Sequence, residues 1–225
     1  MSKRERAVLP IIMLMGPPGS GKGTQASALQ ERFGFERIET GAMLRAIREG
    51  PSPAARRVRE LMDAGQLAPP PLVADFVIRE ARRIRGGGKG IVFDGSPRTL
   101  AEAERLFAAL RKDRIDRVLV VVLDVPKPET LRRVLQRWIC EHCQRSGPLR
   151  ESTPEICDAC GEKLVRRPDD TADVMEKRWE EYAFRTLPVV RFFERRGLVA
   201  HLNGDQPIPE VCAAVAAQVG ERFGL

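Results

Sequence analysis

The chain has 225 residues, of which 43% are hydrophobic, so it can build the core of one or two folded domains and is not disordered. Its longest apolar run, Ala7–Met15, contains Pro10 and is too short to span a bilayer, which excludes a transmembrane protein. Lys and Arg outnumber Asp and Glu by 38 to 31, which permits nucleic acid, an anionic membrane surface or a small polyanion as ligand.

Two further features narrow the ligand class and the compartment. Aromatic residues make up only 5% of the chain and no block of consecutive Lys and Arg occurs, which disfavours a nucleic acid polymer and favours a small phosphate-rich ligand. The apolar run near the N-terminus ends in glycines and not in a cleavage site, so we expect a cytoplasmic protein.

The hydrophobic pattern alternates between strands and helices along the chain, which predicts a parallel sheet with crossover helices. Strands are expected at Leu9–Met15, Gly90–Phe93, Val118–Val125 and Leu198–Leu202. Helices are expected at Lys22–Phe33, Met43–Glu49, Pro53–Ala64, Leu72–Arg85, Leu100–Lys112, Pro128–Trp138, Ala172–Arg196 and Pro209–Phe223. Between Trp138 and Arg167 the periodicity is lost, and a compact domain needs something to hold so long a segment.

A glycine-rich loop joins the first expected strand to the first expected helix, with the sequence Gly16-Pro17-Pro18-Gly19-Ser20-Gly21-Lys22-Gly23-Thr24. Its glycines let successive backbone N–H groups and the helix N-terminus point at phosphate oxygens, and Lys22 reaches the outer phosphates as a point charge. A strand-to-helix turn without a ligand is the alternative, but such a turn has no use for Lys22. The loop therefore predicts a nucleotide phosphate site.

The loop resembles that of the adenylate kinase family of nucleoside monophosphate kinases, and further motifs extend the likeness. Residues 40–45 resemble the family's Thr-Gly-Asp-x-x-Arg, in which threonine and arginine bind the monophosphate. Residues 94–99 resemble Asp-Gly-Phe-Pro-Arg-Thr, which implies that Asp94 sits near the magnesium and its waters and that Arg98 binds the monophosphate. Arg133 and Arg137 fall where the family keeps two phosphate-binding arginines ahead of its lid. Residues 167–170 together with Arg178 resemble the family's Arg-x-Asp-Asp and a later Arg. In the family these complete a cage, that is, a group of arginines around the substrate phosphates.

The resemblance implies a role for each matching residue. The catalytic residues would be Lys22, Arg98, Arg133, Arg137, Arg167 and Arg178. ATP would bind Gly16, Gly19, Ser20, Gly21, Lys22, Gly23, Thr24, Arg133, Arg137 and Gly204. The monophosphate would bind Thr40, Gly41, Arg45, Gln66, Leu67, Gly95, Arg98, Glu102, Arg167 and Arg178. Mg²⁺ bound with ATP would lie near Thr24 and Asp94.

The residue types suit this chemistry without reference to any family. An acceptor phosphate is already a nucleophile, so phosphoryl transfer to it needs positioning and charge neutralisation and not a strong base. Arginine serves well because its planar fork binds two oxygens and stays charged. Each arginine has the alternative of a solvated charge on a helix face, and Asp94 that of a helix N-cap.

Two Cys-x-x-Cys pairs lie in the segment that lacks periodicity, at Cys140 and Cys143 and at Cys157 and Cys160. In a reducing cytosol this spacing predicts a closed, tetrahedral structural zinc site that folds the segment, with disulfides or unbound thiols as the alternative and iron as a second possible metal. Some adenylate kinases resemble the chain here, with a zinc-bearing lid between the positions of Arg137 and Arg167.

Departures from the family pattern fall on the acceptor side of the expected site. Ala42 replaces an aspartate, Ser96 replaces a phenylalanine, and prolines at 69–71 replace an acidic helix opening. Glu102 stands where adenylate kinases place a glutamine that reads adenine. The alternative for Glu102 is a solvated charge on the helix opened by Thr99.

The prediction is an α/β, P-loop NTPase-like three-layer fold. Its core would comprise residues 1–39, 86–137 and 169–225, with a helical monophosphate-binding insertion at 40–85 and a zinc-stapled lid at 138–168. We expect reversible phosphoryl transfer from MgATP to AMP, giving two ADP. The alternatives are a kinase of UMP, CMP or GMP and a nucleotide-binding adaptor with little turnover. The expected partners are ATP and a nucleoside monophosphate, with no nucleic acid polymer and no membrane, and the chain is expected to be a monomer.

Overall fold

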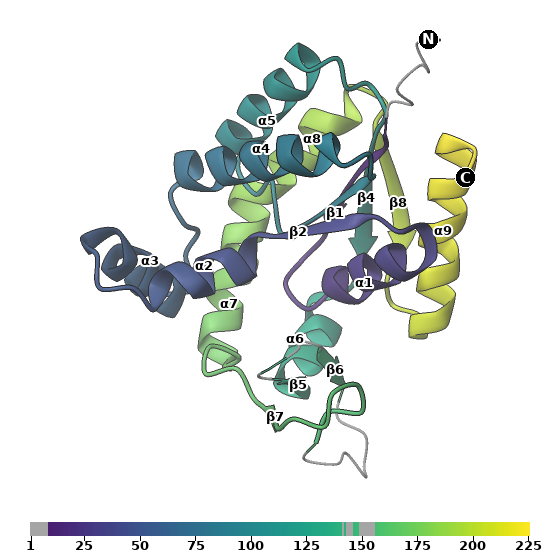
Figure 1. The fold of residues 1–225 in the computed structure, drawn as a ribbon. Helices are drawn as coiled ribbons and strands as arrows, with labels where there is room; N and C mark the ends of the chain where they lie inside the picture. Colours follow the sequence, from purple (N-terminus) through teal and green to yellow (C-terminus); the bar gives the residue numbers. More distant parts are fainter. Residues whose placement is uncertain (1–8, 141, 143–145, 149–155) are drawn as a thin grey trace.

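The computed structural model describes residues 9–140, 142, 146–148 and 156–225. A five-stranded parallel sheet forms its centre, in the order β2-β3-β1-β4-β8 (Figure 1). The strands are β1 (Ile11–Met15), β2 (Glu36–Glu39), β3 (Ile91–Asp94), β4 (Val118–Asp124) and β8 (Val199–Asn203). Four of these strands confirm the sequence-based prediction.

Strand β2 is the one that the prediction missed. Its sequence is Glu-Arg-Ile-Glu, with Ile38 alone buried, because it forms an edge of the sheet and pairs only with β3. A short edge strand with charged residues lacks the apolar run that marks the central strands.

Helices cover both faces of the sheet, which gives the predicted three layers. They are α1 (Lys22–Phe33), α2 (Thr40–Arg48), α3 (Pro53–Asp63), α4 (Pro70–Gly86), α5 (Leu100–Lys112), α6 (Lys127–Leu135), α7 (Ala172–Glu181), α8 (Leu187–Glu194) and α9 (Ile208–Phe223). In β1, Ile11, Met13 and Met15 join the core with α4, α5 and α8, while Ile12 and Leu14 join the core with α1 and α9. This alternation is the period of two that a strand buried on both faces requires.

Between α7 and α8 the helix widens into a π-helical turn, η1 (Tyr182–Thr186), where the sequence predicted one continuous helix. Pro188, in the first turn of α8, has no N–H to give and its ring excludes an ordinary i−4 carbonyl contact. The N–H of Leu187 accordingly bonds to the carbonyl of Tyr182, five residues earlier.

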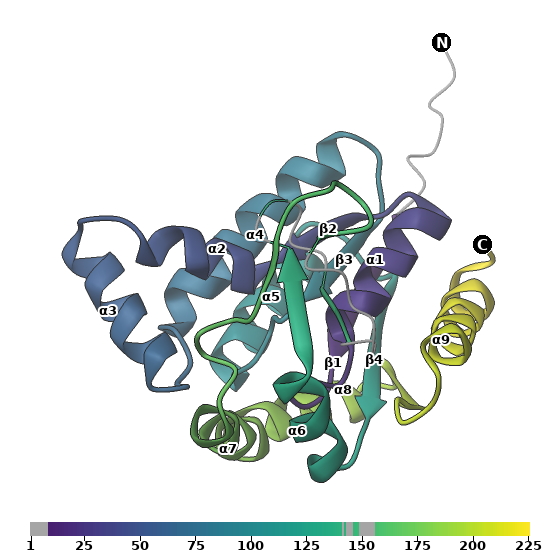
Figure 2. The same cartoon turned by 90° about the horizontal axis from the view of Figure 1, so that it is seen from below.

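A second, antiparallel sheet lies beyond the carboxyl ends of the central strands, below them in Figure 1 and in front of them in Figure 2. It comprises β5 (Arg137–Cys140), β6 (Ser146–Pro148) and β7 (Leu164–Val165), in the order β6-β5-β7. The helix expected at Pro128–Trp138 was therefore predicted too long, since α6 ends at Leu135 and Arg137 begins β5.

Helices α2 and α3 project to the left of the sheet in Figure 1. Helix α4, which the sequence grouped with them, packs into the core through Val73, Val77, Ala81 and Ile84. None of the described helices combines the length and apolar content needed to cross a membrane.

Candidate active site

The phosphate loop lies between β1 and α1 and takes backbone conformations that only glycine adopts easily. Gly16 and Gly19 have φ values of +139° and +82°. A Cβ on Gly16 would lie 2.6 Å from the carbonyl oxygen of Leu123, and one on Gly19 would lie 2.6 Å from that of Thr130. The loop is therefore pressed against β4 and α6 and has no space for side chains at these two positions.

Lys22 turns its ammonium group back into this loop. Its Nζ donates to the carbonyl oxygens of Gly16 at 2.9 Å and Pro17 at 2.7 Å, and lies 3.3 Å from Ser20 Oγ. Burial of the ammonium group, followed by the charges of Arg98 and Arg137, lowers the pKa of Lys22 to about 7. Burial and the nearby arginines thus disfavour the charged form of Lys22, and a bound anionic ligand would stabilise it.

The end of β3 carries Asp94 and Gly95, and Thr40 at the start of α2 contacts both. The buried Thr40 hydroxyl donates to the carbonyl oxygen of Gly95 at 2.8 Å and lies 3.3 Å from that of Asp94. A Cβ on Gly95 would lie 2.8 Å from both Thr40 Oγ1 and an Arg98 nitrogen. The two segments predicted to bind the monophosphate are therefore joined directly.

Arg98 follows the turn after β3, and the hydroxyl of Thr186 donates to its carbonyl oxygen at 3.0 Å. Arg98 is an exposed residue, yet desolvation of its guanidinium lowers its pKa, although Glu102 and Asp94 oppose the change. Arg178 and Arg45 lower the pKa of Arg98 further, so both lie within electrostatic range of it.

Glu102 is not the solvated charge that the sequence offered as its alternative role, because the residue is only 2% exposed. Its carboxylate accepts from the backbone N–H of Arg98 at 2.8 Å and lies 3.2 Å from the hydroxyl of Thr99, which in turn caps the N–H of Glu102. This arrangement resembles a capping box at the start of α5, with the carboxylate bonded to the N–H of the residue before the N-cap Thr99. Burial raises the pKa of Glu102, against the lowering effect of these bonds and of Arg98.

Arg133 on α6 joins the phosphate-loop side of the site to the loop after β8. One of its nitrogens donates to the carbonyl oxygen of Gly204 at 2.9 Å, and others contact Glu129 at 2.6 Å and Asp205 at 3.2 Å. The structure therefore brings together Arg133 and Gly204, two residues predicted to bind ATP from distant parts of the chain.

Arg137 and Arg178 each pair with one of the two aspartates of the Arg-x-Asp-Asp motif. Arg137 forms a two-pronged ion pair with Asp170 at 2.5 and 2.9 Å, and Arg178 pairs with Asp169. Burial raises the pKa of Asp169, but Arg178 outweighs this effect and the net pKa is lowered.

Arg167 is held among other cations. Burial, followed by the charges of Arg137 and Arg45, lowers the pKa of Arg167 to about 10. Its Nε is buried and has no hydrogen-bond partner among the described residues. A buried donor without a partner is costly, so this nitrogen is suited to receive an anionic oxygen.

Gln66 and Leu67, predicted to frame the monophosphate base, lie in the connection between α3 and α4. Gln66 is exposed and its N–H bonds to the carbonyl oxygen of Leu61, while Leu67 is half-buried. A Cβ on the preceding Gly65 would lie 3.1 Å from the carbonyl oxygen of Val174, so the connection rests against α7, the helix that carries Arg178.

Three of the predicted metal ligands lie together. The sulfur atoms of Cys140, Cys157 and Cys160 all lie within 4.8 Å of one another, and those of Cys140 and Cys160 are 3.4 Å apart. Backbone bonds from Gly161 to Cys157 and from Cys157 to Glu162 form a tight turn around the second pair. The fourth predicted ligand, Cys143, lies outside the described residues. Three sulfurs at this spacing fit a zinc ion.

Comparison with known proteins shows which family the chain resembles. The profile of the family described as "Adenylate kinase" matches residues 14–198. The chain is 36% identical to the adenylate kinase of Erythrobacter litoralis, over 92% of this chain and 98% of that protein. It is 34% identical to that of Carboxydothermus hydrogenoformans, over 91% and 96%, and 33% identical to that of Thermotoga neapolitana, over 95% and 98%.

The chain belongs to the adenylate kinase family. The adenylate kinase motifs do not include two charged residues that pair with predicted site residues, Arg37 and Glu39, which both lie on the unpredicted strand β2. Arg37 pairs with Asp94 at 2.5 Å, and Glu39 pairs with Arg45 at 2.7 Å. The sequence signal for both is the alternation of Glu-Arg-Ile-Glu, which places Arg37 and Glu39 on one face and Ile38 on the other.

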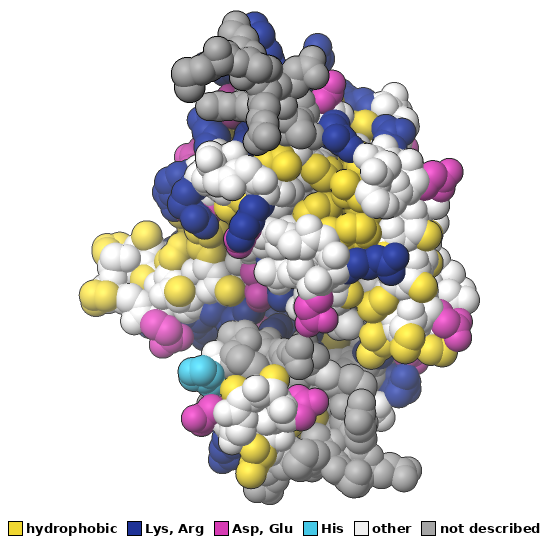
Figure 3. All heavy atoms as spheres, turned by 45° about the vertical axis from the view of Figure 1, so that its right-hand side comes forward, with side chains coloured by type: hydrophobic (Ala, Val, Ile, Leu, Met, Phe, Trp, Pro, Cys, Tyr) yellow, Lys and Arg dark blue, Asp and Glu magenta, His cyan; other side chains and the backbone are white. Residues whose placement is uncertain are grey.

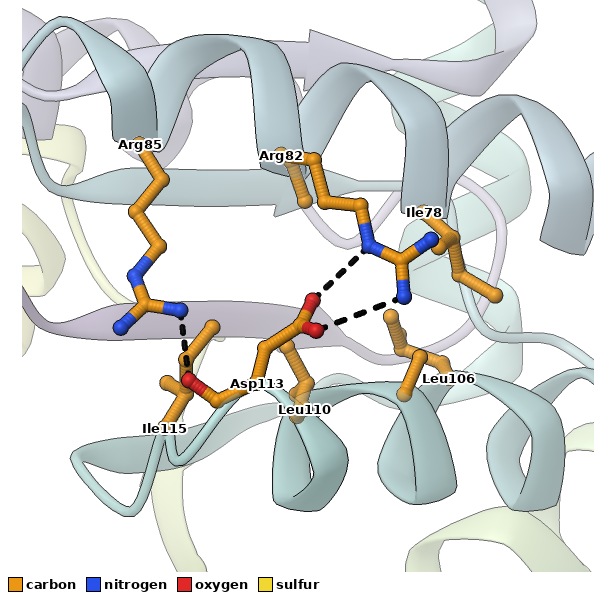
Figure 4. Close-up of a pocket in the computed structure, with 9 residues that line it drawn as sticks. Ile78, Arg82, Arg85, Leu106, Leu110, Asp113 and Ile115 are labelled. Carbon is orange, nitrogen blue, oxygen red and sulfur yellow. Dashed lines mark hydrogen bonds and ion pairs between the residues drawn. The ribbon is translucent and has the colours of Figure 1, made fainter.

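Other hollows in this adenylate kinase family member lie away from the phosphate loop. A cavity of about 10 Å³ between α4 and α5 is closed by Arg82 and Arg85, which both bond to Asp113, and it can hold no more than a water molecule (Figure 4). A groove of about 310 Å³ lies between α1 and α9 and includes Arg32 and Cys212. On the face in Figure 3, Lys and Arg side chains lie among acidic and hydrophobic ones and form no continuous basic surface.

Proposed function

We propose that the chain transfers the terminal phosphoryl group of MgATP reversibly to AMP, giving two ADP. One observation carries the proposal, namely that six cations converge between the phosphate loop, the end of β3 and the two aspartates of residues 169–170. Lys22 is affected by Arg98 and Arg137, Arg98 by Arg178 and Arg45, and Arg167 by Arg137 and Arg45. Such a concentration of positive charge suits a ligand with several phosphate groups and stabilises the charge that moves during transfer.

The donor side would be formed by the phosphate loop and α6. The backbone of Gly16 and residues 19–24 would surround the ATP phosphates, Lys22 would exchange its bonds with loop carbonyls for phosphate oxygens, and Arg133 and Arg137 would contact the same ligand from α6 and β5. Thr24 and Asp94 would lie near Mg²⁺, which would neutralise charge on the donor phosphates. Asp94 lies beside the loop, since a Cβ on Gly23 would be 3.4 Å from its carboxylate.

The acceptor side would be formed by α2, the end of β3 and the segment that carries the two aspartates. Arg45, Arg98, Arg167 and Arg178 would bind the acceptor phosphate, with the backbone of Thr40, Gly41 and Gly95 close to it. Gln66, Leu67 and Glu102 would frame the base. Arginine forks would hold donor and acceptor phosphates in line, which is the main contribution a protein makes to this reaction.

Two segments would close over the substrates and exclude water. These are the projecting helices α2 and α3 of the monophosphate-binding insertion and the lid at residues 138–168. Arg137 and Arg167 flank the lid, and the charge of Arg137 lowers the pKa of Arg167. Movement of the lid would therefore also move these two positive charges relative to the substrate phosphates.

Zinc would hold the lid through Cys140, Cys157 and Cys160, with Cys143 as the fourth ligand. Four thiolates leave no open coordination position, so the metal would supply folding free energy and no catalysis. Its support is the proximity of the three described sulfur atoms.

The test is a coupled assay of ADP production with MgATP and AMP, UMP, CMP and GMP in turn. We expect AMP to give the highest kcat/KM. A higher value for another monophosphate would replace AMP as the acceptor, and absence of turnover with all four would favour the nucleotide-binding adaptor. Calorimetric titration with ATP separates an inactive binder from a protein that binds no nucleotide.

A further inference from the structure

A chain of four charged residues joins the acceptor-binding arginine to the aspartate beside the phosphate loop. Glu39 Oε1 lies 2.7 Å from an Arg45 nitrogen, and Glu39 Oε2 lies 3.1 Å from Arg37. The same Arg37 nitrogen lies 2.5 Å from Asp94 Oδ2. The side chains of all four residues are between 11% and 28% exposed, so solvent screens these contacts only in part.

The backbone explains why this chain of charges forms. Glu39 and Asp94 are register partners on the paired strands β2 and β3, which places two carboxylates opposite each other. Like charges in that position repel, and Arg37 lies between them and contacts both. Glu39 is also the residue before α2, but its side chain makes no capping bond to that helix. Its carboxylate is instead directed to the arginines.

We propose that Glu39 determines the affinity of the acceptor site by pairing with Arg45 when no monophosphate is bound. Arg45 satisfies its charge with this carboxylate, and an incoming phosphate must share or replace that contact. The phosphate of a nucleoside monophosphate carries close to two negative charges at neutral pH, so it is also repelled by Glu39. Glu39 therefore weakens acceptor binding, an inference that rests on the proposed function.

The sequence of residues 39–42 shows where the negative charge near Arg45 comes from. The family pattern has an aspartate where this chain has Ala42, and Glu39 supplies a carboxylate three residues earlier. This segment thus has a carboxylate at the end of β2 and none in the first turn of α2. From there it reaches Arg45 and Arg37, which lie on α2 and β2.

The test is the substitution Glu39→Gln, which keeps the shape and hydrogen-bonding oxygen of the side chain but removes its charge. We expect the KM for AMP to fall about three- to fivefold, the effect of losing a partly exposed ion pair near 1 kcal/mol, with kcat and the KM for ATP changed less than about twofold. The dissociation constant for AMP, measured by calorimetry, should fall by the same factor. Glu36→Gln is the matched control, because Glu36 lies on the same strand but pairs at the surface with Lys89.

A second comparison shows whether Glu39 acts through Arg45. In an Arg45→Gln background, Glu39→Gln should lower the KM for AMP by a smaller factor than in the parent. An unchanged or higher KM in the Glu39→Gln single variant, or an equal factor in both backgrounds, would overturn the proposal. Failure of the proposed function is distinct, because the parent itself would then produce no ADP from AMP.

Discussion

Lys22 shows at the scale of one residue how strongly the site is charged. Its ammonium group bonds to two carbonyl oxygens of its own loop, yet burial and nearby arginines bring its pKa to about 7. We therefore expect Lys22 to raise the rate of catalysis but to lower the stability of the folded protein without nucleotide.

Replacing Lys22 with Ala should lower kcat about a thousandfold, which corresponds to about 4 kcal/mol of transition-state stabilisation. The reason is the loss of the charge that contacts the transferred phosphoryl group, while the fold is kept. Coupled ADP production measures the loss. Lys112→Ala, an exposed lysine at the end of α5, is the control and should keep full activity. Near-normal turnover in Lys22→Ala would falsify the proposed role of the loop.

The lowered pKa of Lys22 also predicts how stability depends on pH. The folded protein releases the Lys22 proton near pH 7, whereas the unfolded chain keeps it until about pH 10.5. The unfolded state therefore binds more protons between these values, so the contribution of Lys22 to stability rises with pH. Without nucleotide, Lys22→Met should melt at a higher temperature than the parent at pH 7, and the difference should shrink towards pH 10. A difference that does not change with pH would contradict the lowered pKa.

Glu102 has a structural role that its position in the motif did not indicate, and its proposed contact with the base can be tested separately. A carboxylate only accepts hydrogen bonds, whereas a glutamine amide also donates one to the ring nitrogen of adenine. Glu102→Gln should therefore raise the ratio of kcat/KM for AMP over that for GMP by about tenfold, while its amide oxygen can still accept from the N–H of Arg98. Glu104→Gln, exposed on the same helix, should leave the ratio unchanged. If Glu102→Gln also leaves it unchanged, Glu102 serves the helix alone.

At the scale of elements, the small antiparallel sheet is the part of the structure that depends most on a metal. Strand β7 has two residues and β6 has three, and such short strands have little stability of their own. The cysteines lie at the end of β5 and in the turn that leads to β7. A metal would tie these segments together where apolar burial is small.

The purified protein should therefore contain about one zinc per chain, as measured by elemental analysis. Cys157→Ala should reduce the zinc content and lower the melting temperature by several degrees, because folding free energy supplied by the metal is lost. Cys212→Ala on α9 is the matched control and should keep the zinc. A protein that contains no metal and takes up none after thiol reduction would contradict this prediction, whereas bound iron would change only the identity of the metal.

At the scale of the whole molecule, the fold followed from local patterns, whereas the contacts between distant charges did not. The apolar runs of β1 and β4 and the glycines around Lys22 are local signals, and they predicted the parallel sheet and the phosphate loop correctly. The pair of Arg37 and Asp94 joins residues 57 positions apart, and Arg37 lies on a strand with one buried residue. The burial of Glu102 likewise depends on packing that no local pattern records. The motifs therefore identified the arginines and the aspartates that pair with Arg137 and Arg178, but not Arg37 and Glu39 on the edge strand.

The π-helical turn between α7 and α8 can be regarded as one surplus residue absorbed inside a helix. Each residue turns an α-helix by about 100°, so deleting one residue from Tyr182–Thr186 would rotate α8 by that amount relative to α7. Phe193, fully buried, and its neighbour Val189 would then leave the apolar core that α8 shares with α5 and the sheet. The π-helical turn thus fixes the rotation of α8 relative to α7 about the helix axis. Arg178 is directed to the site from the first half, and the aromatic residues are directed to the core from the second.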